Sequence, residues 1–534
     1  MESEHPHKPA APAALACACA AILTLPCVTA VAAQFAQHSA DITDWTTAIP
    51  DPWLLTSSVL WAIGIGALAA LLAWPAAWVV ARRGLRPSML TPMLVPSYLA
   101  YHSLGLLRDP TTWLGNLIEH AATAPPDGPG LFFVPVLVGR VLAFVGLGLW
   151  AWPLAALVLG SALRTAEPEL TDNLEMDGAG AMRRHLMFAL RVRGAWARAA
   201  GLVALVMLGS AVPLHLSAAP TLAVAAWQEV TLHPGSPSVW LTTWPLLVIA
   251  LAGAWVLSGS VLRAESESEA RPDPTRTTLW ATRALVCAST VLPLVLYALF
   301  LRTWHSIPAF LRVSGDAAAT SAETSSLAGI AGALVCGVFW WACASGRRTG
   351  APALRTALCA AVFASLVPGV LVGHAWAAFW TLVHAPDALM DSALPTVLAH
   401  TSRSAGVAAL AGCALAALEP RDTRDARAID AGPSLLAWAR TGLSWPTLAG
   451  VAVGVASLSL HEIESSIVVQ PPGLLSLPQT MLANLHFARQ EETSAGAIIV
   501  IGAGLLVTWA VGLLLARRNT TRYHPPRCAR SSIG

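Results

Sequence analysis

Residues 164–192, RTAEPELTDNLEMDGAGAMRRHLMFALRV, form a charged segment between two long apolar runs. Apolar side chains recur in it at near-helical spacing at Leu170, Leu174, Met182 and Leu186. Charged side chains occupy the other sides, so the segment predicts short amphipathic helices that are broken around Gly178. Such a segment offers an apolar ridge to a soluble partner.

A related segment occupies residues 419–446, again between two apolar runs. Both segments carry an aspartate followed by small residues, Asp177-Gly178-Ala179 in the first and Asp430-Ala431-Gly432 in the second. Two such segments predict a chain built from two halves.

The composition places everything around these segments in lipid. Of the 534 residues, 55% are hydrophobic and only 12% are charged, and the mean hydropathy is +0.61. A polytopic membrane protein has this composition. The formal net charge of +2 gives no reason to expect a nucleic acid partner. Lys8 is the only lysine in the sequence, which excludes a P-loop nucleotide site.

The nine cysteines indicate neither a disulfide framework nor a metal site. All except Cys528 lie inside apolar runs, where cysteine acts as a small buried apolar residue. No catalytic motif accompanies them, so neither an enzyme nor a resident cofactor is expected.

About twelve apolar runs approach the roughly 20 residues that a membrane-spanning helix needs. They cover residues 11–33, 54–81, 88–107, 141–163, 197–217, 239–262, 281–301, 327–345, 355–381, 401–418, 447–460 and 495–516. We interpret the first as a retained helix rather than a cleaved signal peptide, because it is long and follows an acidic start. The fold class predicted is thus an all-α polytopic membrane protein.

The arginines predict the orientation of these runs. Every second connection is rich in arginine, including both charged segments, and such connections face the cytoplasm. Both termini are then cytoplasmic, in what we expect to be a bacterial inner membrane. Thr56-Ser57-Ser58 and Thr324-Ser325-Ser326 open two runs that end in arginine pairs. This echo predicts two parallel six-helix halves, residues 1–270 and 271–534.

The two charged segments resemble the cytoplasmic EAA loop of binding-protein-dependent ABC transporter permeases. Asp172-Asn173-Leu174 and Asp425-Ala426-Arg427 occupy the Glu-Ala-Ala positions of the two copies. The resemblance extends to residues 461–492, where His461-Glu462, a Pro-Pro-Gly sequence and a Leu-Pro pair look like the closing segment of fused two-domain permeases of the ferric-iron type.

This resemblance implies a type-1 permease fold and several partners. Each loop, residues 164–193 and 419–446, would dock on a separate ATPase subunit, and the ATPase is expected to be a dimer. An extracytoplasmic binding protein would deliver the solute, for which ferric iron is favoured and thiamine or a phosphonate is the alternative. The implied coupling residues are Leu170, Asp172, Leu174, Asp177, Gly178, Asp425, Ala426, Asp430 and Gly432.

Polar residues within or next to weak apolar runs predict a translocation path. These are Tyr101, His102, His461, Glu462 and Glu464. Polar side chains inside a membrane protein usually line a path or a cavity. No tight metal site is expected among them. The competing interpretation of the chain is an ion-coupled secondary transporter, which parallel repeats also allow.

Overall fold

The computed structural model describes residues 11–37, 50–84, 86–123, 133–165, 173–174, 176–263, 274–345, 351–419, 422, 426, 445–471 and 473–522. All secondary structure in these ranges is helical. Seven of the described helices are long and apolar enough to cross a bilayer. They are α1 (Ala11–Gln37), α2 (Pro52–Arg83), α6 (Val134–Arg164), α12 (Ser238–Arg263), α15 (Ser306–Ala344), α25 (Gln490–Arg522), and a composite of α13 (Arg276–Val286), η3 (Cys287–Val291) and α14 (Leu292–Leu299). The described part of the chain is therefore all-helical, with the apolar helices of a polytopic membrane protein.

Prolines break two of the predicted spans. The run 88–107 consists of four short helices, α3 (Pro87–Leu90), η1 (Thr91–Leu94), α4 (Ser97–Gly105) and η2 (Leu106–Arg108). The run 355–381 bends by 107° between α16 (Ala351–Leu366) and α17 (Gly369–Leu382). Pro96 and Pro368 stand at these breaks, where proline removes a backbone donor and clashes with the preceding turn. Both runs are therefore broken helices, and the predicted number of about twelve spans is not confirmed.

Other predicted boundaries also differ from the helices observed. The run 197–217 divides into α9 (Arg193–Leu208) and α10 (Val212–Leu216). Runs 401–418 and 447–460 correspond to α19 (Leu394–Ala417) and α22 (Trp445–Leu460). The predicted span 327–345 is only the second half of α15, because its first half carries charged residues that lower the hydropathy without preventing a helix.

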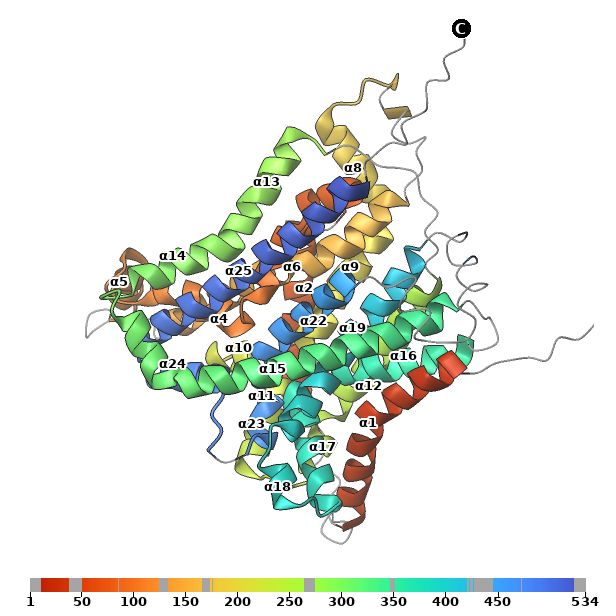
Figure 1. The fold of residues 1–534 in the computed structure, drawn as a ribbon. Coiled ribbons are helices and arrows are strands. Elements are labelled where there is room, and N and C mark those ends of the chain that lie inside the picture. The colour runs from red at the N-terminus through yellow and green to blue at the C-terminus, as the bar shows by residue number, and fades with distance from the viewer. Residues whose placement is uncertain are drawn as a thin grey trace, which may run out of the picture.

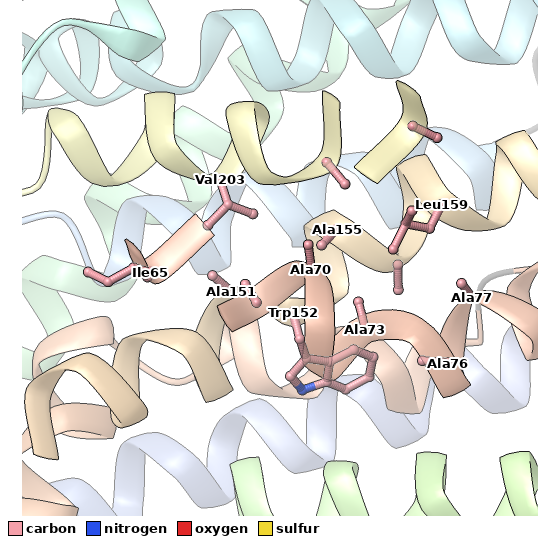
Figure 2. Packing of buried hydrophobic residues seen from close by; sticks show 14 of the residues in the cluster. Ile65, Ala70, Ala73, Ala76, Ala77, Ala151, Trp152, Ala155, Leu159 and Val203 are labelled. Carbon is pink, nitrogen blue, oxygen red and sulfur yellow. The ribbon is translucent and has the colours of Figure 1, made fainter. Parts of the chain in front are cut away.

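Two groups of three helices pack in the same way. In the N-terminal group, α2 packs against α6 and α9, and in the C-terminal group, α15 packs against α19 and α22. Figure 2 shows the small side chains between α2 and α6, among them Ala70, Ala73, Ala151 and Ala155. Small residues let helix backbones approach closely, and such close packing favours helix association in lipid.

Glycines mark the closest approaches in both groups. A Cβ on Gly66 of α2 would lie 2.3 Å from the carbonyl oxygen of Ala200 in α9. A Cβ on Gly329 of α15 would lie 2.5 Å from the carbonyl oxygen of Ala452 in α22. Neither position has room for a larger residue, so each glycine permits one helix crossing.

The first helix of each part packs on the other part. Helix α1 lies against α16 and α17 (Figure 1). In the C-terminal part, α13 lies against α2 and α14 lies against α4. The last long helices also reach the other part: α12 packs against α16, and α25 packs against α3 as well as against α14 and α15 of its own part. The N-terminal and C-terminal parts are therefore interlocked. Shorter helices complete the described chain: α5 (Trp113–Ala122), α8 (Ala181–Arg191), α11 (Leu222–Leu232), α18 (Asp387–Met390), α23 (Ser466–Val469) and α24 (Leu477–His486).

Candidate functional site

Helix α8 forms an amphipathic shelf at one end of the bundle (Figure 1). It follows a turn in which Gly178 has φ +63°, a left-handed conformation that glycine adopts without strain. A glycine at the predicted break thus allows the chain to reverse before α8 begins.

The inner face of α8 is anchored on α2 by aromatic contacts. The rings of Phe188 and Trp78 lie 5.1 Å apart between centroids, and those of His185 and Trp78 lie 4.7 Å apart. Both pairs meet edge to face, the arrangement that aromatic rings prefer. Burial, together with the positive charge of Arg184, lowers the pKa of His185 below 6.5. The histidine is therefore mainly neutral at pH 7 and packs as an aromatic ring.

The outer face of α8 is apolar and exposed. Met182, Leu186 and Leu190 follow one another at intervals of four residues, and they are 84%, 57% and 58% exposed. Residues four apart on a helix lie on one face, so these side chains form a continuous stripe. We call this stripe the α8 ridge. Met176, just before the turn at Gly178, is also exposed.

The predicted coupling residues have different outcomes. Leu174 is 4% exposed and packs in the N-terminal core, so its assignment to the exposed docking ridge was wrong. The amphipathic spacing correctly identified Leu174 as part of an apolar side, but tertiary packing buries this residue. Asp177 and Gly178 are exposed in the turn, and Ala426 is exposed and helical. Leu170, Asp172, Asp425, Asp430 and Gly432 lie outside the described residues.

A second cluster holds the sharp bend between α16 and α17. The guanidinium of Arg403, from α19, donates through one nitrogen to the carbonyl oxygens of Ser365 and Val367. Glu464 accepts a hydrogen bond from the amide of Gly369 at 3.2 Å through Oε2. The bend leaves these backbone groups without helical partners, and buried backbone groups need partners. The side chains of Arg403 and Glu464 therefore stabilise the bend.

Glu464 also joins the bend to the N-terminal part. Its Oε1 accepts hydrogen bonds from the amides of Ala211 at 2.6 Å and Val212 at 3.1 Å, at the start of α10. The side chain is 8% exposed. Glu462 lies beside it, accepts from the amide of Ser465, and has Oε2 3.7 Å from Nε of Arg403. Both carboxylates thus have internal partners, and Glu464 crosslinks three segments.

The predicted path residues are not gathered in one place. Glu462 and Glu464 are neighbours, and His461 precedes them at the end of α22. His102 contacts a different element, since its Nδ1 lies 3.2 Å from the hydroxyl of Tyr297 in α14 and the two rings stack. Tyr101 is buried and donates to the carbonyl oxygen of Leu216 over 3.4 Å. Tyr101 and His102 therefore hold helices together.

A matched pair of contacts was not predicted from the sequence. Nε2 of His374 in α17 lies 3.3 Å from the side-chain amide nitrogen of Gln34 in α1. This contact matches the one between His102 of α4 and Tyr297 of α14. Each histidine contacts the first helix of the other part. A sequence signal was available, because residues 94–102 and 366–374 share Leu-Val-Pro, a leucine and the histidine at equal spacing.

Among the described residues, no group of three His, Cys, Asp or Glu side chains is arranged to hold a metal ion. No protein family, curated protein or solved structure matches the chain. The arguments for a function consequently rest on the geometry of this chain and on the sequence resemblance described above.

Proposed function

We propose that the chain is the membrane-spanning permease of an ABC importer, coupled to a separate ATPase subunit through α8. The observation that carries this proposal is the α8 ridge. It is an exposed apolar stripe outside the candidate membrane spans, and its opposite face is anchored on a long helix. An exposed apolar patch with a polar surround is typical of a protein interface.

Matched contacts support two parallel halves for this permease. Leu222, the first residue of α11, donates its amide hydrogen to Oγ of Ser58 at 2.8 Å, and Leu477, the first residue of α24, donates to Oγ of Ser321 at 2.7 Å. Ser58 and Ser321 are separated by 263 positions, as are the crossing glycines Gly66 and Gly329. The same separation relates Gln34 to Tyr297, which the two histidines contact.

This arrangement suits alternating access. A docking change at α8 would pass directly to α2 through Phe188 and Trp78, and to α9, which begins two residues after α8 ends. In the proposed mechanism, closure of two ATPase subunits moves the two halves as rigid bodies. Glu464 lies where the halves meet, because its carboxylate accepts hydrogen bonds from Ala211 and Val212 of the other half.

The proposal assigns the chain to a bacterial inner membrane, with six helices or broken helices in each half. The binding protein on the outer face and the ATPase on the inner face are the implied partners. Ferric iron, with thiamine or a phosphonate as the alternative, remains a prediction of the sequence resemblance.

The test is purification of the full chain from its native membrane in mild detergent, with detection of an ATP-hydrolysing subunit in the same fraction. We expect wild type to retain the ATPase and Leu186→Asp to lose at least about tenfold of it, since a charge in an apolar contact costs more than 1.4 kcal/mol. Leu232→Asp is the matched control, because Leu232 is also an exposed leucine and lies at the end of α11, away from the α8 ridge.

Two results would contradict the proposal. If Leu186→Asp retains as much ATPase as Leu232→Asp, the α8 ridge is not the docking surface. If wild type itself purifies without an ATPase under conditions that keep the chain monodisperse, an ion-coupled transporter becomes the better interpretation.

A further inference from the structure

Two cysteine thiols are in contact near the ends of α15 and α19. The thiol of Cys343, in the last turn of α15, donates to Sγ of Cys413 in α19 at 3.2 Å. The two residues are 70 positions apart in the sequence, and the spacing of the cysteines did not predict their contact. Among the described cysteines, this is the only sulfur–sulfur contact, and all of them are free thiols. The packing of two helices has therefore placed a pair of reduced thiols side by side.

The backbones of the two helices hold this contact in place. A Cβ on Gly412 of α19 would lie 2.3 Å from the carbonyl oxygen of Cys336 in α15 and 2.8 Å from the backbone nitrogen of Trp340. The helices therefore cross at close range directly beside Cys413. A disulfide bond needs its sulfur atoms about 2.05 Å apart, so the two thiols must approach by roughly 1 Å more. That movement is no larger than the shifts of about 1–2 Å that packed helices make.

Cys343 is the thiol of this pair that a reagent can reach. It is half-buried, whereas Cys413 is 3% exposed. The arginine pair Arg347-Arg348 follows in the sequence, which predicts that this end of α15 faces the cytoplasm. Cytoplasmic reductants keep thiols reduced, so a disulfide formed here would be reversible. An oxidant that reaches a thiol packed among apolar side chains must be small and uncharged, as hydrogen peroxide is.

The pair can react with a peroxide in two balanced steps. The thiolate of Cys343 attacks one oxygen of hydrogen peroxide, the O–O bond breaks, and the sulfur becomes a sulfenic acid. Hydroxide leaves and takes up the proton that the thiol released. The sulfur of Cys413 then attacks the sulfenic sulfur, and the hydroxyl group leaves with the proton of the second thiol as water. In sum, two thiols and one peroxide give one disulfide and two water molecules.

The matching place in the N-terminal half cannot react in this way. The separation of 263 positions places Val80 where α15 has Cys343. The glycines at the matching close approaches of α6 and α19, Gly160 and Gly412, differ by 252 positions. The residues that follow them therefore correspond, and the one in α6 is Ser161. Valine and serine form no disulfide, so the thiol pair belongs to the C-terminal half alone.

We propose that Cys343 and Cys413 are an oxidative modification site, at which a peroxide forms a disulfide that fixes the end of α19 on α15. Helix α19 ends at Ala417, and the second segment that resembles a coupling loop, residues 419–446, begins two residues later. Fixing α19 restrains the base of that segment and slows ATP hydrolysis by the bound ATPase. This effect rests on the permease function proposed above, whereas formation of the disulfide does not.

The first experiment maps disulfides in the full chain, purified in mild detergent and treated with hydrogen peroxide. Free thiols are then blocked by alkylation, the chain is digested without reductant, and crosslinked peptides are measured by mass spectrometry. Cys343→Ser removes one sulfur of the pair. Cys336→Ser is the matched control, because Cys336 is a buried cysteine seven positions earlier on the same helix. Each variant is first shown to be monodisperse by gel filtration.

We expect the crosslink between Cys343 and Cys413 to form at least about tenfold faster than any other, because reacting atoms held in contact have a high effective concentration. It should form in wild type and Cys336→Ser, be absent from Cys343→Ser, and disappear with dithiothreitol. No crosslink in wild type, or one that joins Cys413 to Cys336 instead, would overturn the proposal. So would oxidation of Cys343 to a sulfinic acid without any crosslink.

The second experiment measures ATP hydrolysis by the complex that copurifies with the chain. Peroxide should lower the rate in wild type roughly fivefold or more, the lower end of typical coupling between two sites, and dithiothreitol should restore it. Cys343→Ser should keep its rate, which excludes oxidation of the ATPase itself as the cause. An equal loss in both chains, or a crosslink without a loss, would refute the effect on coupling. A chain that purifies without an ATPase but forms the crosslink would refute the proposed function and keep the modification site.

Discussion

Replacing Glu464 should destabilise the protein more than any other single carboxylate change near the α16–α17 bend. Glu464→Ala removes the acceptor for three buried amides, those of Ala211, Val212 and Gly369. Each buried donor left unpaired costs about 1–3 kcal/mol, so the loss is roughly 3–9 kcal/mol before any water enters. Glu464→Gln keeps one carbonyl oxygen toward the start of α10 and loses only the bond from Gly369, which costs roughly 1–3 kcal/mol.

The assay measures the midpoint of thermal unfolding in a single detergent. Unfolding is monitored by the loss of the monodisperse gel-filtration peak after heating. Wild type should have the highest midpoint, followed by Glu464→Gln and then Glu464→Ala. Glu492→Ala is the control, because Glu492 is an exposed carboxylate at the start of α25. A midpoint for Glu464→Ala equal to that of Glu492→Ala would refute the view that this side chain holds the two parts together.

Two further predictions concern the helix crossing and the α8 shelf. Gly66→Ala should destabilise the protein by about 1–3 kcal/mol through overpacking, because its Cβ would lie 2.3 Å from a backbone oxygen. Gly201→Ala, whose Cβ would meet nothing within 4 Å, should leave the thermal midpoint unchanged or higher. Since burial lowers the pKa of His185, its stabilising contribution is present above pH 6.5 and is lost as the pH falls below that value. Limited proteolysis at the arginines of α8 should then accelerate between pH 7.5 and 5.5 in wild type and stay constant in His185→Phe; equal acceleration in both would exclude this histidine as the cause.

The long apolar helices could be predicted from the sequence, and the broken ones could not. Hydropathy identifies α2, α6 and α12 because a long apolar run has few alternatives to a buried helix. It fails around Pro96 and Pro368, where the runs stay apolar while the backbone turns. The partners that make such turns tolerable, Arg403 and Glu464, are remote in sequence, and only the tertiary structure brings them to the bend.

The candidate site shows the same division. The amphipathic pattern correctly indicated a helix after Gly178, but it could not tell that Leu174 packs inward while Leu186 stays exposed. The repeated Thr-Ser-Ser sequence illustrates a further limit. It aligns Ser58 with Ser326, whereas the hydrogen bonds align Ser58 with Ser321, five positions earlier. In helices so rich in Ser, Ala and Gly, short matches arise in several registers, and contacts decide among them.

The exchange of first helices has a consequence for biosynthesis. Helix α1 is made first, but its partners α16 and α17 begin only at Ala351. At about 5–20 residues per second, residues 38–350 take roughly 15–60 s to synthesise. During that interval α1 must stay in the bilayer without its final neighbours, which its lipid-compatible side chains Ile22, Leu25 and Val28 allow. A ribosome that stops before α16 would therefore leave an inserted but unassembled fragment, a natural substrate for membrane proteases.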